Sequence, residues 1–307
     1  MMPPTTILVT GGAGHVGSHV IELLVADPAN RVISLDNYSN GRESNHIAGA
    51  EYRRGHTKDV ETLVPETPSI VYHLGEYARI STSKRDIRAV YDMNVVGTFA
   101  IAEYCRTRGV AKLVYAASST KFAIEGDGRN QSPYAFTKAT NVDLITNYGK
   151  WFDLPFAICY FYNGFGPRER GDGDSATLIA KFEHLYLRGE PLTVVQPGTQ
   201  RRLFTYVVDL ARGIILAGEK GWGDGYALAS DTSYSVLDIA SAFGGMVEMT
   251  EGDPGRTGAT EPSTKARTEL GWAPTVNVMD YIRSFVATHD RGVSRGEHRD
   301  AMVHHRG

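Results

Sequence analysis

The segment Thr10-Gly-Gly-Ala-Gly-His-Val-Gly17 decides the fold that this chain can adopt. The apolar run Ile7-Leu-Val9 precedes it and an amphipathic stretch, residues 18–27, follows it, so the sequence predicts a strand, a tight turn and a helix. The glycine spacing Gly11-x-x-Gly14-x-x-Gly17 allows the turn, the close approach of a pyrophosphate and close packing of the helix on the strand. The helix N-terminus would offer unpaired N–H groups to the phosphates. The segment therefore predicts a dinucleotide site.

A carboxylate follows the second predicted strand. That strand comprises residues 31–35, and Asp36 comes directly after it, 19 positions beyond Gly17. A carboxylate at this place would accept hydrogen bonds from the ribose 2′-hydroxyl of NAD and would repel the 2′-phosphate of NADP. The sequence therefore favours NAD as the cofactor.

Strand-like and helix-like segments alternate through the first half of the chain. Further strands are expected at 51–54, 69–74, 112–117 and 155–160, and long helices at 83–108 and 133–152. This alternation predicts an α/β fold with a Rossmann-type, doubly wound parallel sheet. The second half predicts helices at 176–188, 208–219, 235–243 and 278–289, a strand at 192–195, a loop at 197–202 and a short helix ending near Trp272.

These segments suggest a chain divided into two domains and a tail. Residues 1–162 together with 205–226 would form the NAD-binding Rossmann domain. Residues 163–204 together with 227–290 would form a smaller C-terminal α+β substrate domain over the carboxyl edge of the sheet, where ligands of such folds bind. Residues 291–307 form a polar tail.

The overall composition is that of a globular protein. The chain has 307 residues, of which 42% are hydrophobic and 22% charged, and a net charge of −3 gives no reason to expect a nucleic-acid partner. Cys105 and Cys159 share no metal-binding or redox spacing, so we expect no metal and a reducing compartment. With neither a signal peptide nor a long apolar run in the sequence, we expect a cytoplasmic protein that does not enter a membrane.

A phenol and an amine are placed together on the predicted helix 133–152. Tyr134 and Lys138 are four residues apart and therefore lie on one helix face. A nearby ammonium favours the phenolate, which makes a tyrosine usable as a base near neutral pH. The hydroxyls of Ser118-Ser119-Thr120 follow the strand 112–117, where they would face the cofactor cleft.

Taken together, these motifs resemble the extended short-chain dehydrogenase/reductases, the family of NAD-dependent nucleotide-sugar epimerases and dehydratases. The resemblance covers roughly residues 6–288. Besides the glycine motif, Asp36, Ser118-Ser119 and the Tyr134/Lys138 pair, it includes His73-Leu74, residues 94–98, residues 163–167, residues 200–206 and residues 270–272.

The resemblance implies a cofactor site. The pyrophosphate would be held by Gly11, Gly14, His15, Val16 and Gly17. The adenosine would be held by Asp36, Asn37, Asn40, Gly41, His56 and Thr57. The nicotinamide half would be lined by Leu74, Gly75, Glu76, Asn94, Tyr134, Lys138 and Tyr162. Two positions depart from the usual pattern: Gly75-Glu76 replaces Ala-Ala, and His56 replaces Asp.

The resemblance also implies a catalytic and substrate site. Ser118, Tyr134 and Lys138 would be catalytic. The nucleotide sugar would contact Ser118, Ser119, Asn163, Arg202 and Arg256. Tyr160 and Leu203 stand where the family usually has Arg and Asp.

Several reactions occur in this family, and the residues present favour one of them. Dehydratases carry an Asp-Glu pair where this chain has Ser119-Thr120, decarboxylases and mannose-type dehydratases need a Glu at position 120, and Asp36 argues against an NADPH-dependent reductase. What remains is epimerisation of a nucleotide sugar at C4, with a UDP-hexose as the expected substrate, a pattern closest to that of the UDP-glucose/UDP-galactose 4-epimerases. A nucleotide-sugar dehydratase or reductase of the same family is the alternative, and a non-catalytic NAD-binding module is a further one. The long helices imply a homodimer, because such helices pair across a two-fold axis in this family.

Overall fold

A seven-stranded parallel sheet forms the centre of the molecule. The computed structural model describes residues 5–122, 128–173, 176–252 and 264–289. The strand order in the sheet is β10-β6-β5-β4-β1-β2-β3, and all six pairings are parallel. The strands are β1 (Thr5–Thr10), β2 (Asn30–Asp36), β3 (Ala50–Arg54), β4 (Ile70–His73), β5 (Lys112–Ser118), β6 (Phe156–Phe161) and β10 (Gly223–Leu228). The predicted Rossmann-type sheet is confirmed, and β1 is the strand at which the chain order reverses.

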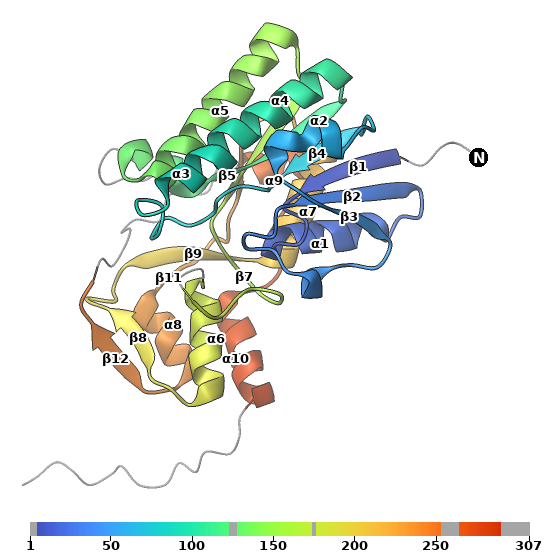
Figure 1. Ribbon diagram of the computed structural model, residues 1–307. Helices are drawn as coiled ribbons and strands as arrows, with labels where there is room; N and C mark the ends of the chain where they lie inside the picture. Colours follow the sequence, from blue (N-terminus) through green and yellow to red (C-terminus); the bar gives the residue numbers. More distant parts are fainter. Residues whose placement is uncertain (1–4, 123–127, 174–175, 253–263, 290–307) are drawn as a thin grey trace, which may run out of the picture.

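Helices cover both faces of this sheet (Figure 1). One face carries α1 (His15–Val25), α7 (Val207–Glu219) and α9 (Lys265–Leu270), and the other carries α2 (Val60–Leu63), α4 (Gly97–Arg108) and α5 (Pro133–Phe152). Successive side chains of a strand point to opposite faces. Accordingly Ile7 and Val9 pack under α1, whereas Leu8 packs in the core beneath α4 and α5. Both faces are therefore apolar, as in a fully covered parallel sheet.

The helix expected at 83–108 differs from the prediction in its start and its regularity. It begins with α3 (Ile87–Val90), continues through a π-helical segment, Tyr91–Val96, and ends as α4. The widened turn contains Asn94, whose amide holds the backbone of Tyr77. By contrast, α5 has the predicted bounds, because the Ser132 hydroxyl caps its first turn and Pro133 fits the first helical position.

The second half of the chain builds a separate apolar core below the central sheet (Figure 1). Its three-stranded sheet has the order β11-β9-β7 and its two-stranded sheet pairs β12 with β8. These strands are β7 (Asn163–Phe165), β8 (Leu192–Val195), β9 (Arg201–Tyr206), β11 (Ser233–Ser235) and β12 (Val247–Thr250), and the helices are α6 (Leu178–Arg188), α8 (Val236–Phe243) and α10 (Val278–His289). The loop expected at 197–202 is wrong in its last two residues, which begin β9.

Two further expectations concern the C-terminal tail and membrane-spanning helices. The tail 291–307 lies outside the described residues. In the described ranges, no helix combines the length and the apolar character needed to cross a membrane.

Candidate functional site

A cavity of about 1120 Å³ opens at the carboxyl ends of the central strands. Both halves of the chain line it. Most of the predicted site residues lie on its wall, namely Gly11, Gly14, His15, Val16, Gly17, Asp36, Asn37, Asn40, Gly41, His56, Thr57, Leu74, Gly75, Glu76, Ser118, Ser119, Tyr134, Lys138, Tyr162, Asn163 and Arg202. Asn94 does not line it, since its side chain bonds Tyr77 and Thr137, and Arg256 lies outside the described residues.

Gly11 and Gly17 of the glycine turn are packed too closely to carry a side chain. Gly11 has a φ of +72°, and a Cβ there would lie 2.8 Å from the Cα of Gly75. A Cβ on Gly17 would lie 2.1 Å from the carbonyl oxygen of Gly11. Gly75 is close to the same turn, since a Cβ there would lie 2.9 Å from the Gly11 nitrogen. Helix α1 begins directly behind this turn, so the cradle that a pyrophosphate requires is present.

Asp36 ends β2 at the cavity wall, where the sequence placed it. One carboxylate oxygen accepts a hydrogen bond from the Ala13 N–H at 2.9 Å and the other from the Tyr38 N–H at 2.7 Å. Burial raises the pKa of Asp36, and these two backbone donors oppose that rise. The carboxylate is thus held in one orientation at the edge where a ribose hydroxyl would bind.

His56 and Thr57 lie at this same end of the cavity. The Nε2 atom of His56 is 3.2 Å from a carboxylate oxygen of Asp92, and burial lowers the pKa of this histidine. Thr57 is buried against Gly97, where a Cβ would lie 2.2 Å from the threonine hydroxyl.

The predicted catalytic residues come together from two elements. Ser118 is the last residue of β5, Tyr134 lies in the first turn of α5 and Lys138 lies one turn later. All three are almost fully buried, with exposed fractions of 8%, 9% and 6%. Lys138 donates to the carbonyl oxygen of Ala116 at 2.6 Å. The arrangement can hold a substrate hydroxyl between a serine and a tyrosine, with a fixed ammonium beside them.

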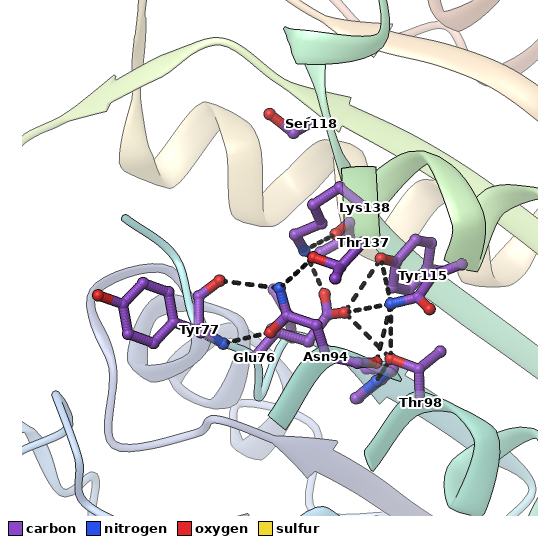
Figure 2. Close-up of polar contacts among 12 residues, drawn as sticks. Glu76, Tyr77, Asn94, Thr98, Tyr115, Ser118, Thr137 and Lys138 are labelled. Atoms are coloured by element: carbon purple, nitrogen blue, oxygen red, sulfur yellow. Dashed lines mark hydrogen bonds and ion pairs between the residues drawn. The ribbon is translucent and has the colours of Figure 1, made fainter. Parts of the chain in front are cut away.

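A buried carboxylate holds the same lysine. Figure 2 shows Glu76 in contact with Lys138, Thr98 and Tyr115, while Ser118 lies apart from this cluster. Lys138 donates to one oxygen of Glu76, and the other oxygen accepts from the Thr98 hydroxyl at 3.0 Å and the Tyr115 hydroxyl at 3.1 Å. The sequence predicted Glu76 near the cofactor but not its pairing with Lys138.

Two charged side chains that line the cavity, Arg79 and Glu169, were not predicted from the sequence. The Nε atom of Arg79 is buried with no hydrogen-bond partner. One oxygen of Glu169 lies 3.8 Å from Nδ1 of His15. Burial raises the pKa of Glu169 to about 7 and lowers that of His15 to about 3. Glu169 follows the 163–167 motif by two residues, which is the signal that could have identified it.

The substrate side of the cavity is formed by the second half of the chain. Asn163 on β7 donates to the carbonyl oxygen of Leu203 at 2.8 Å, and Arg202 on β9 lines the cavity with its pKa lowered by burial. The two unusual residues at nearby positions differ in their place. Tyr160 donates to Asp224 at 2.6 Å, whereas Leu203 packs in the apolar core and also lines the cavity.

Within the described ranges, no group of three or more His, Cys, Asp or Glu side chains is placed to hold a metal ion. The site therefore offers protein hydroxyls, an ammonium, guanidinium groups and carboxylates as its chemical groups.

Comparisons with known proteins agree with this geometry. The profile of the NAD dependent epimerase/dehydratase family matches residues 7–228. The chain is 29% identical over 304 residues to a UDP-glucose 4-epimerase of Mycolicibacterium smegmatis, covering 91% of this chain and 96% of that one. It is 27% identical over 297 residues to the UDP-glucuronic acid decarboxylase 6 of Arabidopsis thaliana, covering 89% and 85%. The UDP-glucose 4-epimerase of Thermus thermophilus in complex with NAD superimposes with a TM-score of 0.81 at 28% identity, covering 94% and 100%.

Proposed function

Because the chain belongs to the NAD dependent epimerase/dehydratase family, we propose that it epimerises a nucleotide sugar, with a UDP-hexose as the substrate class, at C4 through a transient 4-keto intermediate. The observation that carries this proposal is that Ser118, Tyr134 and Lys138 line one cavity, while the positions after Ser118 hold hydroxyls instead of carboxylates. NAD is the family's cofactor, and the glycine cradle and the Asp36 carboxylate fit it.

The roles of the residues follow from their chemistry. The cofactor, when bound, supplies a hydride acceptor at C4 and a donor for the return. Tyr134 takes the proton of the 4-hydroxyl and later gives it back, which is the work of a positioned acid–base group. Ser118 hydrogen-bonds the same oxygen in both states, and Lys138 favours the phenolate. Asn163 and Arg202 bind the diphosphate, so the sugar is held while its ring turns over.

The proposal also assigns the two halves of the chain. Residues 1–162 with 205–226 hold the cofactor, and residues 163–204 with 227–290 hold the nucleotide sugar. Each part has an apolar core, but the end of β10 and α9, which fall in the second range, pack in the core of the central sheet, and residues of both parts line the cavity. The free thiols of Cys105 and Cys159 suit a reducing cytoplasm.

A dehydratase or decarboxylase is the alternative, since the family contains both classes. A dehydratase needs an acid–base group beside C5 of the sugar. A decarboxylase instead removes CO₂ from a uronate. Of the described residues, three carboxylates line the cavity: Asp36 at the end of β2, Glu76 against Lys138, and Glu169 beside His15. Positions 119 and 120, where the family's dehydratases place their carboxylates, are Ser and Thr.

An exchange experiment separates these reactions. The protein is incubated with a panel of UDP-sugars in D₂O, and the products are analysed by mass spectrometry and NMR. The expected product has the mass of its substrate, an inverted C4 and no deuterium at C5, because the hydride that leaves C4 returns to C4. Deuterium at C5 with loss of water, or loss of CO₂ from a uronate, would instead show the alternative reactions. Bound NAD with no product from any sugar would favour the non-catalytic module.

We also propose that the protein forms a homodimer through the outer face of α3, α4 and α5, which lie side by side along one surface of the molecule (Figure 1). Large apolar side chains are exposed there: Ile87, Tyr91, Val96, Phe99 and Phe136. Large apolar side chains exposed together on one surface are typical of a protein–protein contact, and pairing around a two-fold axis would cover them in both copies.

A further inference from the structure

We propose that Glu76 is a positioning residue for Lys138: its buried carboxylate fixes the lysine ammonium and offsets part of the positive charge that the lysine presents to Tyr134. The part that concerns Tyr134 as a base rests on the proposed function. The pairing of Glu76 with Lys138 does not.

The carboxylate occupies a site built to receive it. The side chain of Glu76 is 1% exposed and that of Lys138 is 8% exposed. Lys138 donates to one oxygen. The other oxygen accepts three hydrogen bonds, from the hydroxyls of Thr98 and Tyr115 and from the Asn141 amide at 2.8 Å. Four donors from α4, β5 and α5 thus converge on one carboxylate. Figure 2 labels three of the donor residues, Lys138, Thr98 and Tyr115.

The hydrogen bonds that link Glu76 to Thr98, His73 and Thr10 allow one consistent assignment of donors and acceptors. Thr98 has a single hydroxyl proton and gives it to Glu76, because a carboxylate accepts only. Thr98 must then accept from Nε2 of His73, which lies at 2.9 Å, and Nδ1 of that ring accepts from the Thr10 hydroxyl at 2.7 Å. Thr10 in turn accepts the Gly75 N–H at 2.9 Å. Burial lowers the pKa of His73 to about 4, so the ring is neutral, as this order requires.

The orientation of the Asn141 amide fits a charged carboxylate on Glu76. The side-chain oxygen of Asn141 is buried with no hydrogen-bond partner, while its amino group faces the carboxylate. A buried unpaired carbonyl is costly. The opposite orientation would point that oxygen at Glu76 and at the carbonyl oxygen of Asn94, which accepts from the same amino group at 2.9 Å, so the two acceptors together fix the amide in the present one.

Two consequences follow for Lys138. An ammonium has three N–H bonds. Glu76 takes one and the Ala116 carbonyl takes another, which leaves one for the cavity. The lysine is therefore oriented by the protein before any ligand binds. In addition, the negative charge of Glu76 lowers the positive potential that favours a phenolate at Tyr134.

Other charged and titratable groups face this pair from neighbouring elements. Arg79, in the segment between β4 and α3, acts electrostatically on Tyr134, and Glu169 beyond β7 acts on Arg79. Tyr115 on β5 contacts Glu76, and its pKa is raised well above the usual value by burial and by that carboxylate. His73 on β4 is neutral. Arg79 is thus the cation near Tyr134 that Glu76 does not contact.

The test measures phenolate formation without a substrate. Absorbance at 295 nm is titrated between about pH 6 and 11 for the protein and for its Tyr134→Phe derivative, and their difference reports Tyr134 alone. We expect Glu76→Gln, which keeps the shape and removes the charge, to lower the midpoint of this difference signal by about one pH unit. Tyr115→Phe is the matched control: it removes one hydrogen bond to Glu76, keeps the charge, and should leave the midpoint within about 0.3 pH unit.

A second variant covers the case in which Glu76→Gln does not fold. Glu76→Ala introduces the residue usual in the family and should move the midpoint in the same direction. An unchanged midpoint in a folded Glu76 variant would overturn the proposal, as would an equal shift in Tyr115→Phe.

The outcomes also separate this proposal from the proposed function. If the midpoint falls but no UDP-sugar is converted, Glu76 positions Lys138 and the epimerase proposal is wrong. If sugars are epimerised, the acidic limb of the kcat profile should move to lower pH by the same amount in Glu76→Gln. Epimerisation of a UDP-sugar together with an unchanged midpoint in Glu76→Gln would support the epimerase proposal and overturn the role of Glu76.

Discussion

Tyr134 is the residue on which the proposed chemistry depends most directly. Tyr134→Phe keeps the ring in its buried place and removes the group that accepts the 4-hydroxyl proton. We expect kcat to fall by about 10²–10⁴-fold, the usual contribution of a positioned acid–base group, while NAD affinity stays within about twofold. Turnover with UDP-glucose and a fluorescence titration with NAD measure the two effects. Ser118→Ala should be milder, because water can replace one hydrogen bond, and a Tyr134→Phe protein with full turnover would exclude the assignment.

Asp36 should control the choice between NAD and NADP. Its carboxylate is buried, fixed by the Ala13 and Tyr38 N–H groups, and faces the cavity. A 2′-phosphate would meet this charge at close range, so we expect NAD to bind at least about 100-fold more tightly than NADP. Asp36→Ala should reduce the ratio to about 10 or less. Equal binding of both dinucleotides by the unmodified protein would contradict the role of Asp36.

At the residue scale, the sequence could place side chains but not pair them. Asp36 and Ser118 end buried strands, and Tyr134 and Lys138 share a helix face, so local pattern was sufficient to bring all four to one cavity. The partners of Glu76 lie on three elements. Thr98 lies on α4, Tyr115 lies on β5, and Lys138 and Asn141 lie on α5. No local pattern relates these segments, and so the pairing with Lys138 required the structure.

At the scale of elements, the loop after β7 is docked on α1. Arg168 donates to Glu22 of α1 at 2.6 Å, and His19 lies 3.1 Å from the Pro167 carbonyl oxygen. Glu169, next in the loop, is buried beside His15 at the start of the same helix. A carboxyl group at this contact gives the docking a pH dependence.

The sign of that dependence follows from the pKa of Glu169, which burial raises from the ordinary 4.5 to about 7. The stability that the protonated group contributes is complete below about pH 4.5 and is lost as the pH rises to about 7. Glu169→Gln should therefore match the unmodified protein in urea unfolding at pH 4.5 and exceed its free energy of unfolding by about 3 kcal/mol at pH 8. Glu22→Gln is the control on the same contact: Arg168 lowers the pKa of Glu22, so this variant should gain nothing at pH 8. Equal stabilities of Glu169→Gln and the unmodified protein at both pH values would contradict the prediction.

The elements that were predicted from the sequence differ from the missed strands in how regularly apolar residues recur along them. The helices α5, α7 and α10 and the strands β2, β5 and β6 carry periodic or continuous apolar residues, and their bounds agree with the expected ranges within about one residue. Of the described strands, β7, β9, β10, β11 and β12 were not predicted. Residues 223–228 read Gly-Asp-Gly-Tyr-Ala-Leu, with a shift of register against β6, so their strand pairing depends on the sheet edge that β6 provides.

At the scale of the whole molecule, the cavity exists only because two parts of the chain meet. The central sheet supplies the glycine turn, Asp36 and the catalytic side chains, and β7 and β9 supply Asn163 and Arg202. From a change in character near residue 163, the sequence favours a second part that begins there. The sequence could not predict that β7 and β9 pair in parallel, since this pairing joins residues about 40 positions apart.

The homodimer is the prediction that concerns the whole molecule. Phe99 on α4 is 50% exposed and Val96 just before it is 47% exposed, on the surface that α3 and α5 continue. Covering these side chains in a second copy would remove apolar area from water in both copies at once. Light scattering at about 10 µM should give twice the mass of the chain. Phe99→Glu would place a charge in that contact and should give the single-chain mass, with the fold retained by circular dichroism. Met246→Glu is the matched control, because Met246 is 71% exposed next to β12 in the second half of the chain, and this variant should remain dimeric. A monomeric unmodified protein would show that this face is not an interface. A dimer that Phe99→Glu leaves intact, while Met246→Glu dissociates it, would show the same.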